Sequence, residues 1–144
     1  MFKLFKKKNS INNIQNNEKL LSKTTSLLIY AAKIDENYTN KEKEIIKKTL
    51  IELGAKHSEV DKIIINAEIN EENSNQILDF TKEIKNTDEA FKIKIIESLW
   101  KIIYSNKEAD MFESNLMRRL SGLLYLDNKV VSEIKEKIKK DLVK

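Results

Sequence analysis

The fold is decided by residues 91–126, which read FKIKIIESLWKIIYSNKEADMFESNLMRRLSGLLYL. The first half places apolar side chains around most of a helix that ends near Tyr104, and a helix of this kind is normally buried at the centre of its domain. A polar loop of residues 105–110 follows, and an amphipathic helix begins at Met111. We therefore expect the rest of the chain to pack in layers around this pair of helices.

Length and composition favour a single all-α domain. A chain of 144 residues buries about 68–70% of its unfolded surface, which is enough for a core without covalent crosslinks. The sequence has no proline and only two glycines, and so few breakers among many Ile, Leu, Lys and Glu residues favour helices over a turn-rich β fold. The absence of cysteine excludes disulfides and thiolate metal sites.

Helical periodicity extends outward from the central pair in both directions. Residues 1–16 are predicted as a flexible basic tail, and residues 17–144 as one domain of about seven helices. Gly54 stands where a left-handed C-terminal cap is expected, and Gly122, in the middle of a helix, indicates close packing against another helix. The predicted helices span residues 18–34, 39–53, 58–69, 77–84 and 88–104, with two more that begin near Met111 and before Val131.

Two helix–loop–helix units resemble each other at an offset of 71 residues. A repeat of helix pairs predicts an approximate two-fold arrangement within one domain, although two helical periods can also align by accident. The aligned pairs are Asp35 with Asn106, Glu42 with Glu113, Ile45 with Leu116, Ile46 with Met117, Leu53 with Leu124, and Val60 with Val131.

Both loops of this repeat carry oxygen-bearing side chains at their first, third, fifth and eighth positions. Alternating oxygens closed by a carboxylate one helical turn later can surround a hard divalent cation such as Ca²⁺ or Mg²⁺. Neither loop is an EF-hand, because the glycine at position six and the glutamate at position twelve are missing. The candidate metal ligands are Asp35, Asn37, Thr39 and Glu42 in the first loop, and Asn106, Glu108, Asp110 and Glu113 in the second.

Helix capping explains the same residues without a metal. The segment from Thr39 to Glu42 is a capping box, in which the threonine accepts from the N3 amide and the glutamate accepts from the N-cap amide. The segment from Asp110 to Glu113 can cap its helix in the same way, and a cap contributes about 1 kcal/mol. Capping and cation binding can coexist, so the spacing leaves both interpretations open.

The chain resembles the TerB-like family, which includes tellurite resistance protein B and the related N-terminal domain of the co-chaperone DjlA. In that family the repeated loop is Asp-Gly-x-hydrophobic-x-x-x-Glu-like, and it corresponds here to residues 35–42 and 106–113. A second shared feature is Phe80-Thr81 with Ile84, followed by residues 97–100, Glu-Ser-Leu-Trp. The resemblance spans about residues 27–140 and is greatest to the small stand-alone bacterial members.

The resemblance implies an all-α fold of about seven helices and a divalent-cation site built from the two loops. It also implies a non-enzymatic scaffold role in a stress response of the tellurite type, in the cytoplasm or at the inner face of the membrane. The chain departs from the family pattern, because Glu36 and Lys107 replace the loop glycines and Asn106 stands where an aspartate is usual. Each of these changes should weaken cation binding.

Other functions find little support in the sequence. His57 is the only histidine, and there is no Gly-rich phosphate loop, nucleophile elbow or Ser/His/Asp arrangement, so we expect no enzyme. The expected partner is another protein. Nucleic-acid binding would rest only on the lysine excess behind the net charge of +4, since arginine is scarce.

The N-terminal residues suggest one further partner. Phe2, Leu4 and Phe5 among the lysines of residues 3–8 are compatible with weak contact with an anionic membrane surface. The alternative is a solvated tail or a tail docked on the domain. There is no uninterrupted apolar stretch of about 18 residues, so no membrane span is expected. The basic start is not followed by the apolar block of a secretory signal.

Overall fold

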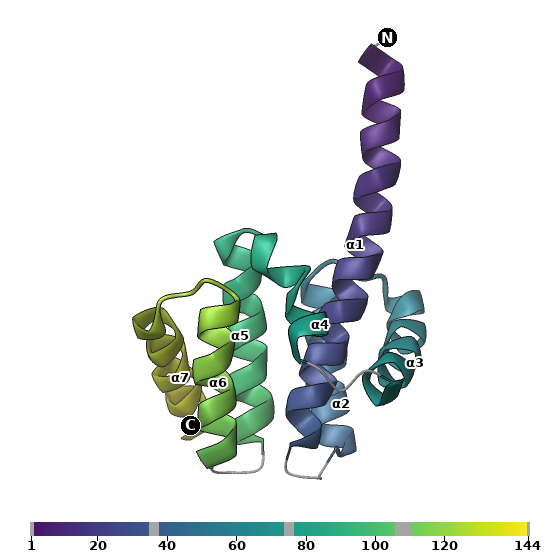
Figure 1. Ribbon diagram of the computed structural model, residues 1–144. Coiled ribbons are helices and arrows are strands. Elements are labelled where there is room, and N and C mark those ends of the chain that lie inside the picture. The colour runs from purple at the N-terminus through teal and green to yellow at the C-terminus, as the bar shows by residue number, and fades with distance from the viewer. Residues whose placement is uncertain (1, 35–37, 74–76, 106–110, 144) are drawn as a thin grey trace.

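The computed structural model describes residues 2–34, 38–73, 77–105 and 111–143, and for residues 2–17, 73, 111–113 and 142–143 it describes the backbone alone. These ranges form seven α-helices and one 3₁₀ turn without a strand, so the predicted all-α fold is confirmed (Figure 1). No helix within them is long and apolar enough to cross a membrane. The elements are α1 Phe2–Lys33, α2 Asn40–Glu52, α3 His57–Asn73, α4 Ile77–Thr81, η1 Ile84–Asn86, α5 Glu89–Tyr104, α6 Met111–Leu123 and α7 Asn128–Val143.

The first helix is longer than predicted. α1 begins at Phe2, so residues predicted as a tail continue the same helix, because no glycine or proline interrupts residues 2–33. Figure 1 shows the N-terminal half of α1 projecting beyond the other helices. That residues 1–16 move independently of the domain stays a prediction.

Two helices form the centre of the domain. The predicted central helix, α5, is confirmed, and its residues Ile95, Ile96 and Leu99 have no exposed surface. α1 is equally enclosed, since residues 24–29 are all buried and the helix packs against α2, α3, α4 and α5. The apolar pattern did not single out α1, because Thr24, Thr25 and Ser26 interrupt it.

The predicted repeat is a unit of three helices. α1 with α2 and α3 corresponds to α5 with α6 and α7, and α4 with η1 connects the two units. α1 packs most extensively on α3, and α5 packs most extensively on α7, as expected for equivalent units. Three pairs of boundaries are 71 residues apart: the ends of α1 and α5 at Lys33 and Tyr104, the starts of α2 and α6 at Asn40 and Met111, and the starts of α3 and α7 at His57 and Asn128.

The turns that follow α2 and α6 have the same geometry. Gly54 has φ +107° and Tyr125 has φ +57°, so both lie in the left-handed region. The amide after each donates to the carbonyl five residues before it, at 2.9 Å in the first turn and 2.8 Å in the second. The predicted cap at Gly54 is confirmed, and the second unit places an aromatic residue at the equivalent position.

Two local predictions need correction. Gly122 is exposed, and a Cβ atom added there would have no neighbour within 4 Å, so this glycine does not mark close packing. The fourth predicted helix is divided into α4 and η1, although Ile77, Phe80 and Ile84 are all buried as their helical spacing indicates.

Polar side chains join the elements inside the core. The Thr49 hydroxyl of α2 donates to the Ser98 hydroxyl of α5 at 2.8 Å. The indole Nε1 of Trp100 donates to the carbonyl of Val131 on α7 at 3.2 Å. These bonds satisfy buried polar atoms. They connect α5 to α2 of the first unit and to α7 of its own unit.

Candidate functional site at the paired loops

The two loops of the repeat leave the domain at the same end. The helices that precede them, α1 and α5, both end away from the projecting half of α1 (Figure 1). The Nζ atom of Lys41, in the first turn of α2, donates to the carbonyl oxygen of Ser105, the C-cap of α5, at 3.0 Å. The residues that flank the two loops are therefore in direct contact, and we call this contact the loop junction.

A buried carboxylate lies at the loop junction. Glu42 has no exposed surface, and its Oε2 accepts the Thr39 amide at 2.9 Å and is also bonded to the Thr39 hydroxyl. Its Oε1 lies 3.5 Å from the hydroxyl of Ser105, which also donates to the Ile102 carbonyl at 2.6 Å. The carboxylate therefore links the start of α2 to the end of α5.

The predicted capping box is confirmed at α2. Thr39 has extended N-cap backbone geometry, with φ −100° and ψ 173°, and it pairs with Glu42 at the N3 position. Glu42 thus has a structural role that does not depend on a metal. The corresponding cap from Asp110 to Glu113 lies outside the described side chains.

The predicted cation ligands are described only in part. Of the eight, Thr39 and Glu42 have described side chains. Within the described part of the chain, no three His, Cys, Asp or Glu side chains gather closely enough to hold a metal ion. The metal site therefore stays a prediction. The ligands outside the description are Asp35, Asn37, Asn106, Glu108, Asp110 and the side chain of Glu113.

The described atoms of the loop junction suit a positive charge. The Lys41 ammonium donates to the carbonyl of Ser105. The residue after Lys41 is Glu42, whose carboxylate is buried. Carbonyl and carboxylate oxygens are the ligands that hard cations prefer. The Ser105 carbonyl thus already accepts from a cationic group of the chain itself, and the metal site stays a prediction.

A second charged cluster surrounds Tyr38, just after the first loop. Lys33 forms an ion pair with Glu71 at 2.7 Å, and Lys43 forms one with Glu68 at 3.3 Å. The two ammonium groups lie 5.9 and 5.1 Å from the centre of the Tyr38 ring. The cluster joins the loop's two flanks to α3. No periodic pattern connects residues so far apart in the chain, so this cluster could not be predicted from the sequence.

The Tyr38 hydroxyl is buried next to the carboxylate of Glu68. Its pKa is raised above the ordinary value, first because burial disfavours the phenolate and then because of the nearby carboxylates of Glu68, Glu42 and Glu71. The surroundings of Tyr38 therefore favour the neutral phenol over the phenolate.

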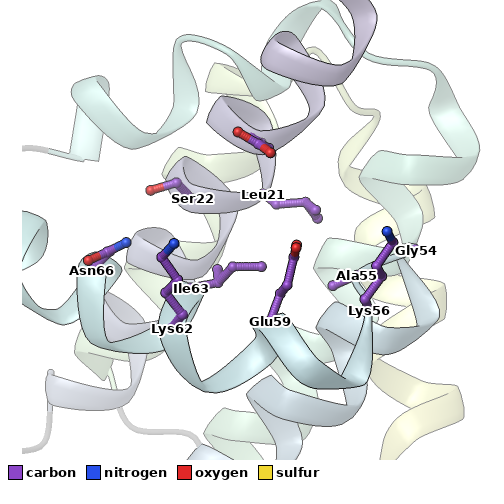
Figure 2. Close-up of a pocket in the computed structure, with 10 residues that line it drawn as sticks. Leu21, Ser22, Gly54, Ala55, Lys56, Glu59, Lys62, Ile63 and Asn66 are labelled. Atoms are coloured by element: carbon purple, nitrogen blue, oxygen red, sulfur yellow. The ribbon is translucent and has the colours of Figure 1, made fainter.

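A hollow lies elsewhere on the described part of the domain. It has a volume of about 590 Å³ and lies between α1, α3 and the turn after α2 (Figure 2). Leu21 and Ile63 contribute apolar atoms, and Glu59 and Lys62 contribute opposite charges. His57, the only histidine of the chain, is not among the residues that line this hollow.

Comparison with known proteins gives one match. Residues 22–136 match the family model for tellurite resistance protein TerB. The matched region contains both three-helix units except residues 2–21 of α1 and 137–143 of α7, and it includes both loops. Searches of curated proteins and of solved structures found no match.

Proposed function

Because the chain belongs to the TerB family, we propose that it is a non-enzymatic scaffold that holds another protein in a tellurite-type stress response, with a divalent cation bound at its paired loops. The loop junction is the observation that supports this proposal. It brings the flanks of both loops together and presents a carbonyl and a buried carboxylate there. A cation at this place would connect the two three-helix units, and a partner that contacts both loops would sense its presence.

Calorimetric titration of the full chain with Ca²⁺, Mg²⁺, Mn²⁺ and Zn²⁺ tests the cation. A ligand present at about 100 times its dissociation constant stabilises the folded state by about 2.7 kcal/mol. For a domain of this size, that stabilisation raises the melting temperature by roughly 8–10 °C. The absence of both heat and a thermal shift at millimolar metal would remove the cation from the proposal.

A variant at Lys41 is expected to bind metal more tightly than the wild type. If the Lys41 ammonium competes for the same oxygens, Lys41→Gln should bind metal more tightly than the wild type. Lys48→Gln is the matched control, because Lys48 is an exposed lysine of the same helix. Glu42→Gln should weaken metal binding, whereas Glu44→Gln, at a side chain that is 74% exposed, should not.

The scaffold role is tested by capture of partners from the native host. Wild type and the Glu42→Gln and Glu44→Gln variants would be used as baits with metal and with chelator. We expect the same protein to be captured reproducibly by the wild type and Glu44→Gln, and to depend on metal. A set of captured proteins that is identical for all baits and insensitive to metal would contradict a role for the loops.

A further inference from the structure

We propose that residues 2–17 of α1 dock the domain on an anionic lipid surface. The observation is independent of the loops, and it starts from composition. The segment contains Lys3, Lys6, Lys7 and Lys8, and the first acidic residue of the chain is Glu18. Phe2, Leu4 and Phe5 stand among these lysines. Cationic and apolar residues together are typical of segments that bind the headgroup region of anionic membranes.

The fold holds this segment away from the rest of the domain. Residues 2–17 are helical and continuous with the buried half of α1 (Figure 1). At 1.5 Å per residue the segment is about 24 Å long. The segment with basic and apolar residues therefore projects from the rest of the domain. A flat surface can contact it there without contacting the other helices.

An anionic surface would also stabilise the helix itself. α1 has no acidic residue in its first turn, and cations near a helix N-terminus interact unfavourably with the helix dipole. A helical segment of this length without tertiary packing is only marginally stable in water. Contact with lipid phosphates would compensate the lysine charges, so binding and helix formation should be coupled.

The composition favours lipid over other anionic or helical partners. Nucleic acid would neutralise the lysines but leave Phe2, Leu4 and Phe5 without a role, and the segment contains no arginine. Parallel pairing with a second copy would bring eight lysines together without a compensating acid, since each copy supplies four. A bilayer interface accepts both kinds of side chain.

Docking in this way leaves the loop junction accessible. The junction lies at the opposite end of α1 from the projecting half (Figure 1). α1 contains 32 residues, so its two ends are about 48 Å apart. The loops would face away from the lipid, where another protein can reach them.

Co-sedimentation of the full chain with vesicles tests the proposal. Neutral phosphatidylcholine vesicles would be compared with vesicles that contain roughly 30% phosphatidylglycerol, at low and high salt. We expect binding to the anionic vesicles only, a steep decrease with salt, and a gain in helical circular dichroism on binding. Each lysine near the surface contributes about a fivefold factor, so replacing Lys3, Lys6, Lys7 and Lys8 by Gln should weaken binding at least 100-fold.

The matched control removes the same charge elsewhere. Lys48, Lys82, Lys137 and Lys140 are exposed on the body, and their replacement by Gln should change binding less than tenfold. Phe2→Ser with Phe5→Ser should weaken binding at unchanged charge. The proposal is overturned by absence of sedimentation, by equal loss in the control, by no effect of the Phe variants, or by tight binding to duplex DNA in place of vesicles.

Discussion

Gly54→Ala and Gly122→Ala are the same chemical change at two exposed glycines, and the structure predicts opposite effects on stability. An added Cβ atom would meet nothing within 4 Å at either position, so steric clash contributes to neither. The difference lies in the backbone. Gly54 has φ +107°, whereas Gly122 belongs to α6 and has an ordinary helical backbone.

The magnitudes follow from conformational preferences. A side chain in the left-handed region costs roughly 1–2 kcal/mol, and alanine returns about 0.4–1 kcal/mol by restricting the unfolded chain. Gly54→Ala should therefore lower the free energy of unfolding by about 1 kcal/mol. Alanine is better than glycine inside a helix by about 0.8–1 kcal/mol, and Gly122 is near the end of α6, so we expect a gain of about 0.5 kcal/mol.

Urea denaturation followed by circular dichroism measures both effects. The two variants should differ by about 1.5 kcal/mol, which corresponds to roughly 5 °C in melting temperature, with equal denaturant slopes. Gly54→Asn is the control for the mechanism, because asparagine tolerates the left-handed region better than alanine. The reasoning is refuted if Gly54→Ala is neutral or if Gly122→Ala destabilises the domain, as close packing at Gly122 would require.

Three further outcomes are expected. The pKa of Glu52 is lowered by its hydrogen bond from Lys94, at 2.7 Å, so the pair's stabilisation is present above the unfolded pKa of about 4.5 and is lost as pH falls further. Glu52→Gln should remove about 0.5 kcal/mol at pH 7 and flatten the acid side of a stability profile, and an unchanged profile would contradict this. Lys33→Met leaves the Glu71 carboxylate, which is 6% exposed, without its ion-pair partner, so chemical denaturation should show that the free energy of unfolding falls by about 2–4 kcal/mol. Adding Glu71→Leu should recover most of this stability, and no recovery would refute the explanation. Leu99→Ala should cost about 2–5 kcal/mol by opening a cavity at a fully buried position, measured in the same way, and a loss below 1 kcal/mol would show that α5 is not the packed centre.

Much of the fold could be predicted because it depends on local periodicity. The apolar residues of α5 and the capping box at Thr39 are short-range features, and the structure contains both. The structure also places Asp88 as the N-cap of α5, with its side chain accepting the Phe91 amide at 2.9 Å. The 71-residue offset is also present in the structure, because α2 and α6 contain 13 residues each and so keep the two units in register.

What could not be predicted depends on contacts across the chain. The buried run of α1 contains hydroxyls, and the Ser26 hydroxyl donates to the carbonyl of Ala67 on α3, at 3.2 Å. Likewise, spacing within one loop identified Thr39 and Glu42 but gave no sign of Ser105, which becomes their neighbour only when the two units pack together. The sequence could therefore indicate candidate ligands but not the atoms that complete the loop junction.

The left-handed residue in the turn between the second and third helices of each unit affects the order in which the two units unfold locally. Glycine adopts this conformation freely, but the tyrosine in the second unit, with 71% of its surface exposed, adopts it against the preference of its own backbone. Opening the turn after α6 therefore costs less free energy than opening the turn after α2. Amide protons at the C-terminal end of α6 should exchange with solvent sooner than those at the C-terminal end of α2. Of the two equivalent units, the second should therefore open first.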